Sequence, residues 1–495
     1  MTRDFDSFSP SMFLSPSALA RRTQRKLLNG FWLAAFGLFV YEIFFTGSES
    51  VLSSAAAILI TAAALLPSYL WCAGSALGMP IFPIFALTFV WTYGLPLVSK
   101  HPTVVKYTPE SHLFAGFTVT GFLLLGTFIW FQFVKYAPPI PKSQLALNSS
   151  RGVPFFLCAL VANLLFDISS TAGWLALDRG TFAIVRGVIL GLSALGIFVL
   201  AYRTGSKELS KKQSQLFLSL LAGLMVTGSV GLLLISAASQ FVIATFAFII
   251  GRKKVPLLPI VIVLICLTFL HYGKDNMRGK YWFGEYKTQV QPWEYPAWFS
   301  EWSGYSWEYL TRNKNDSISA QDSKEKESFA ERSSVIQLLL LTQNKSPGEK
   351  PYLYGATYAI LPQLLIPRFL DSNKIASHEG TYILNIHYGL QTRKQTAGTT
   401  IGWGLLAESY ANFGVFGCAG LAVILGLIYG QVSSWSINAP VLSAKYLFAI
   451  IVMTLAFQTE YSAGVYVASL FQSSISLGGV AVLFMKSYKT PRLSF

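Results

Sequence analysis

Apolar stretches of about 20 residues recur along most of this chain and are separated by short polar connections. A stretch of that length suits a helix that crosses the hydrocarbon core of a bilayer, whereas barrel strands alternate apolar and polar residues in shorter segments. The pattern predicts an all-α fold, a polytopic helical membrane protein with about 12 transmembrane helices. The predicted spans lie near residues 28–46, 51–74, 77–98, 112–134, 153–172, 181–202, 215–234, 236–251, 255–271, 401–429, 440–458 and 465–486.

One long polar, aromatic and charged segment, residues 272–400, interrupts this pattern. It separates an N-terminal bundle of about nine spans, residues 1–271, from about three C-terminal spans in residues 401–495. Two apolar stretches inside the segment, Val335 to Leu341 and one that ends at Pro367, are too short to cross a membrane. We expect them to form interfacial helices that lie on or dip into the outer leaflet.

Lysine and arginine gather in the connections on one side of the predicted bundle and at both ends of the chain. Cytoplasmic connections carry this excess, so we expect both termini in the cytoplasm and residues 272–400 on the outer side of the membrane. The net charge of +15 then reflects topology and contact with acidic membrane lipids, and we expect no nucleic-acid partner. The basic residues on this side are Arg21, Arg22, Arg25, Lys26, Lys142, Arg151, Arg203, Lys207, Lys211, Lys212, Arg252, Lys253, Lys254, Lys486, Lys489 and Arg492.

Composition adds little specific chemistry. Charged residues make up 12% of the chain, against about a quarter in soluble domains. The four cysteines fall within predicted spans, so we expect them to serve packing and we predict no disulfide framework and no metal site. They are Cys72, Cys158, Cys266 and Cys418.

Aromatic residues in the first part of the segment follow a helical spacing. Trp298, Trp302, Tyr305 and Tyr309 would form one stripe on a helix. Such a stripe is typical of an interfacial helix in the aromatic belt of a membrane. It could also serve as a platform on which sugar rings stack, and the two interpretations are compatible.

Fixed cations lie within the segment and at its edges, beside the predicted membrane surface. Arginine binds phosphate oxygens bidentately and stays charged at any accessible pH, so a lipid diphosphate is the anion that we expect here. The alternative is that these side chains pair with carboxylates of the segment or with lipid headgroups. The candidates are Arg278, Arg332, Arg368 and Lys374.

The tenth predicted span carries polar residues below its outer end. Thr400 could cap the helix, and Gly402 leaves backbone N–H groups accessible to an anion. Glu408 and Asn412 are four residues apart and share a face, with Glu408 roughly 12 Å below the end. Arg186 of the sixth span lies at a similar depth, so it could pair with Glu408, which would then order the site. Alternatively, Glu408 acts as a base or orients an acceptor hydroxyl.

Three motifs follow one another between residues 330 and 420. They are Pro351-Tyr352-Leu353-Tyr354-Gly355, Ile366-Pro367-Arg368 and Ala407-Glu408-Ser409-Tyr410-Ala411-Asn412-Phe413-Gly414, accompanied by Arg332 and Lys374. In this order they resemble the Wzy-type polymerases, the O-antigen or oligosaccharide repeat-unit polymerases of bacterial surface polysaccharides. The string Glu-x-Tyr-x-Asn-Phe-Gly is the most specific part, and the rest of the chain agrees in architecture only.

The resemblance implies a metal-independent glycosyltransferase without a cofactor, which acts on undecaprenyl-diphosphate-linked oligosaccharides at the periplasmic face. It also implies a chain-length regulator and a flippase as partners. The acceptor hydroxyl would lose its proton to Glu408 or to a histidine, such as His387; all five histidines fall on the outer side, so the sequence does not single one out. The diphosphate would be bound by Arg278, Arg332, Arg368, Lys374, Arg186 and Thr400. The glycan would contact Trp298, Trp302, Tyr354, Tyr410 and Asn412.

Two other classes stay open at this point. A glycan ligase would use the same lipid-linked donor and differ only in its acceptor. A polysaccharide or lipid transporter would need no large outer segment and would often show repeated halves. The connection after the first span, Gly47-Ser48-Glu49-Ser50, lacks the paired carboxylates of lipid-phosphate-sugar transferases. We therefore expect the site to lie where the segment meets the tenth span, and not in a separate soluble domain.

Overall fold

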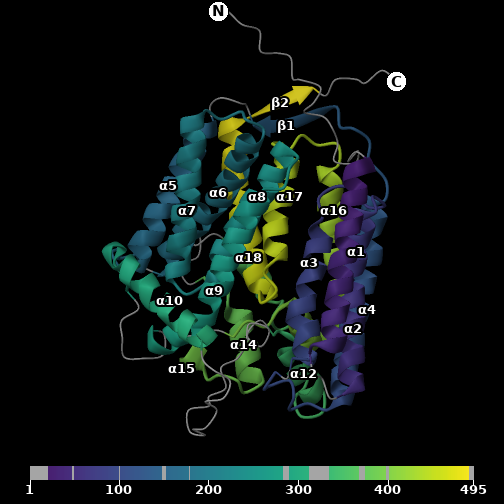
Figure 1. Cartoon of the computed structure of the whole chain (residues 1–495). Helices are drawn as coiled ribbons and strands as arrows, with labels where there is room; N and C mark the ends of the chain where they lie inside the picture. Colours follow the sequence, from purple (N-terminus) through teal and green to yellow (C-terminus); the bar gives the residue numbers. More distant parts are fainter. Residues whose placement is uncertain are drawn as a thin grey trace, which may run out of the picture. The chain divides into compact units, whose positions relative to one another are not determined.

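The chain folds almost entirely into helices, as the computed structural model in Figure 1 shows. It describes residues 21–46, 50–99, 101–147, 152–177, 179–281, 289–311, 334–366, 374–396 and 401–489. The helices are α1 (Arg21–Phe44), α2 (Val51–Cys72), α3 (Ile81–Phe89), α4 (Pro109–Val134), α5 (Gly152–Thr171), α6 (Arg179–Gly205), α7 (Lys211–Val230), α8 (Leu234–Arg252), α9 (Leu257–Tyr281), α10 (Tyr295–Thr311), α12 (Ile336–Lys345), α13 (Leu361–Leu365), α14 (Glu379–His387), α15 (Arg393–Thr396), α16 (Leu405–Ser436), α17 (Ala444–Ala456) and α18 (Ala463–Phe484). Shorter elements are η3 (Val90–Gly94), η4 (Leu95–Leu97), η5 (Pro292–Glu294) and the paired strands β1 (Ser143–Leu147) and β2 (Met485–Lys489).

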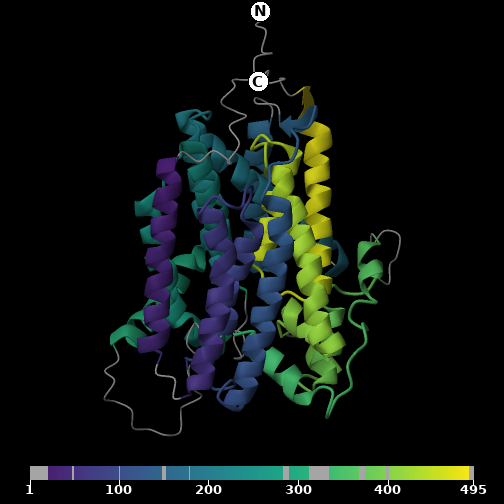
Figure 2. The ribbon, with the colours of Figure 1, turned by 90° about the vertical axis from the view of Figure 1, so that its right-hand side faces the viewer.

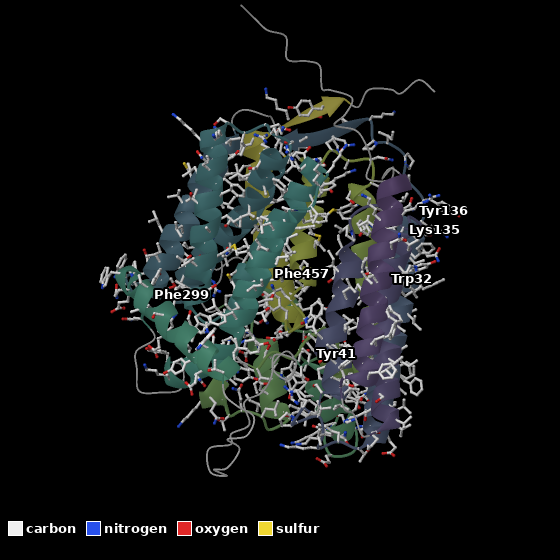
Figure 3. All side chains as sticks on the ribbon, viewed as in Figure 1. Trp32, Tyr41, Lys135, Tyr136, Phe299 and Phe457 are labelled. Carbon is white, nitrogen blue, oxygen red and sulfur yellow. The ribbon has the colours of Figure 1, made fainter. Side chains whose placement is uncertain are left out.

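The predicted fold class is confirmed. Among the described residues, 10 helices are long and apolar enough to cross a membrane. Two further predicted spans are shorter apolar helices, Ile81–Leu97 and Ala444–Ala456. Large apolar side chains are exposed on the outside of these helices, such as Trp32 and Tyr41 on α1 (Figure 3). The chain is therefore a multi-pass membrane protein of the all-α class.

The chain divides into two compact units. Unit 1 contains residues 1–146, 327–471 and 485–495, and unit 2 contains residues 147–326 and 472–484. The long polar segment predicted from the sequence contributes to both units, because its first part belongs to unit 2 and the rest to unit 1. The three-part division expected along the chain therefore describes the sequence pattern, and the compact units cut across it.

Unit 1 is built on close contact of α4 with α2 and α16, which lie side by side in Figure 2. Small residues permit this approach, as they commonly do between membrane helices. A Cβ on Gly116 of α4 would lie 2.7 Å from the Cβ of Ala56 in α2. Gly426 of α16 also lies close to α4, since a Cβ added there would lie 3.0 Å from the carbonyl oxygen of Gly126.

Helix α12 packs inside unit 1, against α4 and α16. Its residues Ile336, Leu339 and Leu340 are buried there by protein. The backbone N–H of Val335 donates to the carbonyl oxygen of Thr92 at 2.9 Å. Thr92 belongs to the π-helical turn η3. This stretch was expected to lie on or dip into the outer leaflet; its apolar side is covered by α4 and α16 and not by lipid.

In unit 2, α10 packs along the end of α9 (Figure 1). The indole N–H of Trp302 donates to the carbonyl oxygen of Leu270 at 2.6 Å. Gly273 of α9 allows the contact, because a Cβ there would lie 2.6 Å from the carbonyl oxygen of Trp302. Trp298 and Trp302 belong to one hydrophobic cluster with Val230. Trp298 is 7% exposed and Trp302 is 0% exposed.

The helical spacing of the aromatic stripe is confirmed, because α10 carries all four residues, but two of the four rings are enclosed by protein and cannot belong to an open sugar-stacking platform. Trp302 is enclosed by protein, and Trp298 packs against Tyr281 with ring centroids 4.4 Å apart. Neither ring offers an open face on the outside of α10. Of the four stripe residues, Tyr309 is exposed, and so is Trp307, which does not belong to the stripe.

The contact of α4 with α16 can be tested with one methyl group. Gly426→Ala places a Cβ 2.8 Å from the Cβ of Ile129. Overpacking costs about 1–3 kcal/mol, which exceeds the gain of up to about 1 kcal/mol from replacing glycine by alanine in a helix. We expect a lower Tm for the detergent-purified protein. Gly420→Ala is the control, because nothing lies within 4 Å of its Cβ and its Tm should stay equal or rise. An equal or higher Tm for Gly426→Ala would contradict this packing.

Candidate functional site

The first turns of α16 are separated from the rest of the helix by a kink. The backbone leaves helical geometry at Phe413 and Gly414, and Gly414 has a φ of +61°. A side chain at Gly414 would be strained there, and its Cβ would also lie 2.8 Å from the hydroxyl of Tyr352. Gly414, the last residue of the Ala407–Gly414 motif, is therefore required by the backbone conformation and by the close approach of Tyr352.

Asn412 is the side chain that fixes the loop before α13 onto α16. Its Nδ2 donates to the hydroxyl of Thr357 and to the carbonyl oxygen of Glu408, both at 2.8 Å. Its Oδ1 accepts from the backbone N–H of Gly355 at 3.0 Å. Its own carbonyl oxygen accepts from the backbone N–H of Tyr354 at 3.1 Å. The amide is fully buried, so these bonds satisfy a polar group that would otherwise be costly there.

Further contacts extend the same interface, which we call the 353–358 clamp. The backbone N–H of Leu353 donates to the carbonyl oxygen of Ala411 at 3.0 Å. The hydroxyl groups of Tyr358 and Ser409 lie 2.7 Å apart, at hydrogen-bonding distance. Burial, and secondly the charge of Glu408, raises the pKa of Tyr358, so this phenol stays protonated at neutral pH.

Glu408 joins the start of α16 to the start of α18. Its Oε2 accepts from the backbone N–H of Ala463, the first residue of α18, at 2.6 Å. A carboxylate is favoured at a helix N-terminus because the free N–H groups and the helix dipole are positive there. The side chain is fully buried, and its Oε1 has no hydrogen-bond partner among the described residues. These contacts favour the structural interpretation, in which Glu408 orders the site.

The expected partner of Glu408, Arg186, lies in unit 2. There the positive charge of Arg186 interacts electrostatically with the carboxyl group of Asp167 in the neighbouring helix α5. Glu408 is bound by a backbone N–H and forms no ion pair with any of the residues that the structure describes. The sequence could not foresee this, because a backbone donor leaves no signal in residue types.

Helix α14 is fixed in unit 1 by three polar contacts. Asn385 accepts the indole N–H of Trp403 at 2.6 Å, just before α16. The hydroxyl groups of Tyr388 and Ser346 lie 2.8 Å apart, and the ring of Tyr388 lies beside that of Trp403. Another hydroxyl pair, 3.0 Å apart, joins α14 to Ser462 before α18. Asn385, Trp403 and Tyr388 are buried and were not singled out from the sequence, because each acts through a partner that is distant along the chain.

His387, at the end of α14, contacts the start of the loop that carries the clamp. Its Nε2 lies 3.0 Å from the carbonyl oxygen of Pro351. A carbonyl can only accept, so Nε2 carries the proton in the neutral ring and Nδ1 keeps a free lone pair. The side chain is half-buried, which leaves this nitrogen a route to a ligand. The ring therefore has the tautomer that a general base requires.

Two other histidines are engaged in unit 1. Nδ1 of His101 accepts from the backbone N–H groups of Thr103 and Val104. His112 is bonded at both ring nitrogens, to the hydroxyl of Ser53 and to the carbonyl oxygen of Val104. Both rings are buried, which assigns them to structure and narrows the choice of base that the sequence left open.

The predicted cations that the structure describes belong to different units. Lys374 lies in unit 1, where its Nζ donates to the carbonyl oxygen of Leu364 at 2.6 Å. Arg278 lies in unit 2 and donates to the carbonyl oxygen of Leu232 at 2.7 Å. Arg332, Arg368 and Thr400 lie outside the described residues.

Unit 1 thus brings together several of the predicted site residues. Tyr354 is 75% exposed and held beside Asn412, and Tyr410 is buried with its ring edge-on to that of Tyr352. His387 lies at the start of the same loop, at Pro351. The arrangement places an imidazole, an exposed aromatic ring and hydroxyl groups on one loop and the helix ends beside it, groups that can hydrogen-bond to and stack on a polyhydroxylated molecule.

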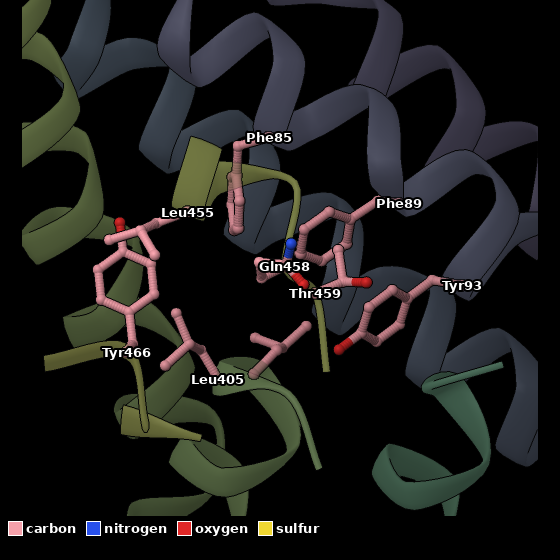
Figure 4. Close-up of a pocket in the computed structure, with 9 residues that line it drawn as sticks. Phe85, Phe89, Tyr93, Leu405, Leu455, Gln458, Thr459 and Tyr466 are labelled. Atoms are coloured by element: carbon pink, nitrogen blue, oxygen red, sulfur yellow. The ribbon is translucent and has the colours of Figure 1, made fainter. Parts of the chain in front are cut away.

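A small cavity lies behind the start of α16 (Figure 4). Its volume is about 10 Å³, enough for about one water molecule. Tyr93, Gln458, Thr459 and Tyr466 give it polar groups, and phenylalanine and leucine side chains complete the lining. It is too small for a substrate, and a bound water would satisfy its polar walls.

The clamp predicts a measurable change in local opening. Asn412→Leu removes three side-chain hydrogen bonds, each with a net contribution of about 0.5–1.5 kcal/mol. We expect amide exchange of residues 353–358 to accelerate at least about tenfold. Asn344→Leu is the control, since that amide bonds only within its own helix, to Leu340. Equal exchange in wild type and Asn412→Leu would show that the amide does not fix this loop.

Comparison with known protein families, characterised proteins and solved structures finds no match to this chain.

Proposed function

We propose that this chain is a membrane glycosyltransferase that polymerises undecaprenyl-diphosphate-linked oligosaccharide repeat units at the periplasmic face of a bacterial inner membrane. The observation that carries the proposal is the clamp. The motif with the most specific family resemblance, Glu408 to Gly414, holds the Tyr352–Tyr358 loop through Asn412. His387 contacts the residue just before this loop, Pro351. A lipid-linked substrate requires a site at the membrane boundary, and a multi-pass helical protein provides one. Both termini are cytoplasmic in this proposal.

The transfer step exchanges one bond for another. The hydroxyl oxygen of the acceptor sugar, on an incoming lipid-linked unit, attacks the anomeric carbon of the growing chain. The bond from that carbon to the diphosphate oxygen breaks, and its electron pair leaves with the lipid diphosphate. The hydroxyl proton passes to Nδ1 of His387, whose Nε2–H is held by Pro351.

Positive side chains would stabilise the charge that develops on the leaving diphosphate. Lys374 is the described candidate in unit 1, since its Nζ is fixed at the carbonyl oxygen of Leu364. Arg332 and Arg368 stay predicted members of this group from their sequence positions. Exposed Tyr354 is a candidate for stacking against a sugar ring.

A reconstituted assay tests the proposal. Purified protein in proteoliposomes is given a lipid-linked repeat unit as its only substrate, and the products are separated by length. A polymerase makes a ladder of lengthened lipid-linked products, and Arg332→Ala or Arg368→Ala removes the ladder. A ligase makes no ladder and transfers the glycan only when a different acceptor is supplied. No transfer with either acceptor would overturn the proposal of a glycosyltransferase.

The role of His387 has its own test. His387→Gln keeps an N–H that can donate to Pro351 but removes the basic nitrogen, so we expect at least a ~100-fold slower ladder with an unchanged Tm. His378→Gln, at the start of the same helix, is the control and should retain the ladder. Comparable rates for His387→Gln and wild type would exclude His387 as the base.

The role of Glu408 is tested by comparing glutamine with alanine. Glu408→Gln retains an oxygen that can accept from the N–H of Ala463, so we expect activity within about tenfold of wild type. Glu408→Ala leaves that donor unbonded and empties a buried volume, which we expect to lower Tm clearly. Loss of activity in Glu408→Gln with an unchanged Tm would instead identify Glu408 as the base.

A further inference from the structure

Glu42, near the end of α1, is a buried carboxylic acid at membrane depth. Its side chain is 2% exposed, and both α1 and α2 are long and apolar enough to cross a membrane. The hydroxyl of Thr61 donates to Oε1 of Glu42 at 2.5 Å. Thr61 lies about ten residues, or about 15 Å, from the start of α2 at Val51, near the middle of this 22-residue helix. An ionisable side chain at such a depth is costly and is usually functional.

The elements around Glu42 supply no positive charge. The sequence contains no lysine, arginine or histidine from residue 27 to residue 99, a stretch that includes α2, α3, η3, η4 and most of α1. Glu42 forms no ion pair within the part of the chain that the structure describes. The titratable side chains of α2 and η3 are Tyr69, Cys72 and Tyr93, and none of these can become a cation. An ionised Glu42 would therefore be a buried charge without a counter-charge.

The contact between Glu42 and Thr61 is enclosed by the π-helical turn η3. A Cβ added at Gly94 of η3 would lie 3.2 Å from the hydroxyl oxygen of Thr61 and 3.7 Å from the carbonyl oxygen of Ala57. The second carboxyl oxygen of Glu42, Oε2, is buried and has no hydrogen-bond partner among the described residues. A proton on the carboxyl group removes the charge that this oxygen would otherwise share, and it needs no opening or cavity for a ligand.

Helix α1 is attached to α2 at two points besides Glu42. Near its other end, the side-chain amide of Gln24 donates to the carbonyl oxygen of Ala73. Between the two polar contacts, the ring of Trp32 lies beside that of Tyr69 with centroids 5.6 Å apart. The large apolar side chains of α1 are otherwise mostly exposed, and Trp32 itself is 57% exposed (Figure 3). The contact of Glu42 is therefore an important part of what holds its end of α1 in place.

We propose that Glu42 is a proton-binding site within the membrane, which carries a proton at neutral pH and releases its end of α1 from α2 when that proton is lost. The proton passes to water and leaves a carboxylate behind. A charge without a partner in an apolar bundle costs far more than the single hydrogen bond from Thr61 supplies, so the contact opens. The contact is thus closed at low and neutral pH and weakens as the pH rises. This inference does not rest on the function proposed above, because neither side chain takes part in the transfer step.

Infrared spectroscopy of the full-length protein in nanodiscs reads the charge state directly. A protonated carboxyl group has a C=O band that an ionised carboxylate lacks, and the band shifts in D2O. The difference between wild type and Glu42→Gln at neutral pH should contain this band. Thr61→Val removes the hydroxyl donor and should raise the frequency of the same band, which identifies it even if Glu42→Gln folds poorly. Glu110→Gln is the control, since Glu110 is exposed in the first turn of α4 and should contribute no such band.

Release of α1 is measured by amide exchange of residues 39–46 in wild type and Glu42→Gln, compared at the same pH so that the chemical exchange rate cancels. Glutamine stays neutral and can still accept from Thr61, so we expect equal exchange at mildly acid pH. At alkaline pH, wild type should exchange at least about threefold faster than Glu42→Gln, because local opening exposes these amides. The Tm of each variant is measured to confirm folding.

Two results would overturn the proposal. The first is a wild-type spectrum at neutral pH in which neither Glu42→Gln nor Thr61→Val changes a protonated carboxyl band, which would show that Glu42 is ionised. The second is an exchange ratio between wild type and Glu42→Gln that is the same at both pH values, which would reject the release of α1 even with the band present.

Discussion

The buried amide of Asn412 is the interaction on which the rest of the candidate site depends. It bonds on one side to the first turn of α16 and on the other to Gly355 and Thr357 of the loop. Backbone that is neither helix nor strand can lie at the boundary of a membrane only where protein satisfies its polar groups. The side chain of Asn412 meets part of that requirement, because it accepts from the N–H of Gly355 and donates to the hydroxyl of Thr357, and the kink at Gly414 makes room for the loop beside it.

The same principle explains the other buried polar residues of unit 1. Glu408 binds the first N–H of α18, and Trp403 binds Asn385 of α14. Each bond joins the start of a helix to a segment outside it. The start of α16 is therefore a junction at which α14, α18 and the clamp are held together. These bonds hold α14 beside the loop, where Nε2 of His387 lies 3.0 Å from the carbonyl oxygen of Pro351.

The sequence predicted most of the fold because a membrane span requires a long apolar run, and such runs are visible without any tertiary information. It also predicted that Glu408 and Asn412 share a helix face, because they are four residues apart. Their partners could not be predicted. Asn412 and Thr357 are 55 positions apart, and Glu408 binds a backbone N–H that any residue at 463 would supply. The spacing of Trp298 and Trp302 likewise predicted a helix, but only the packing of α10 on α9 decided which rings are enclosed.

In the function that we propose, the clamp between the Tyr352–Tyr358 loop and the start of α16 forms the substrate site. A cryo-EM structure of the protein in a nanodisc, with an undecaprenyl-diphosphate-linked oligosaccharide bound, tests it most directly. We expect the saccharide–diphosphate junction to contact His387 and the clamp. Density for the substrate that touches neither of them would contradict it.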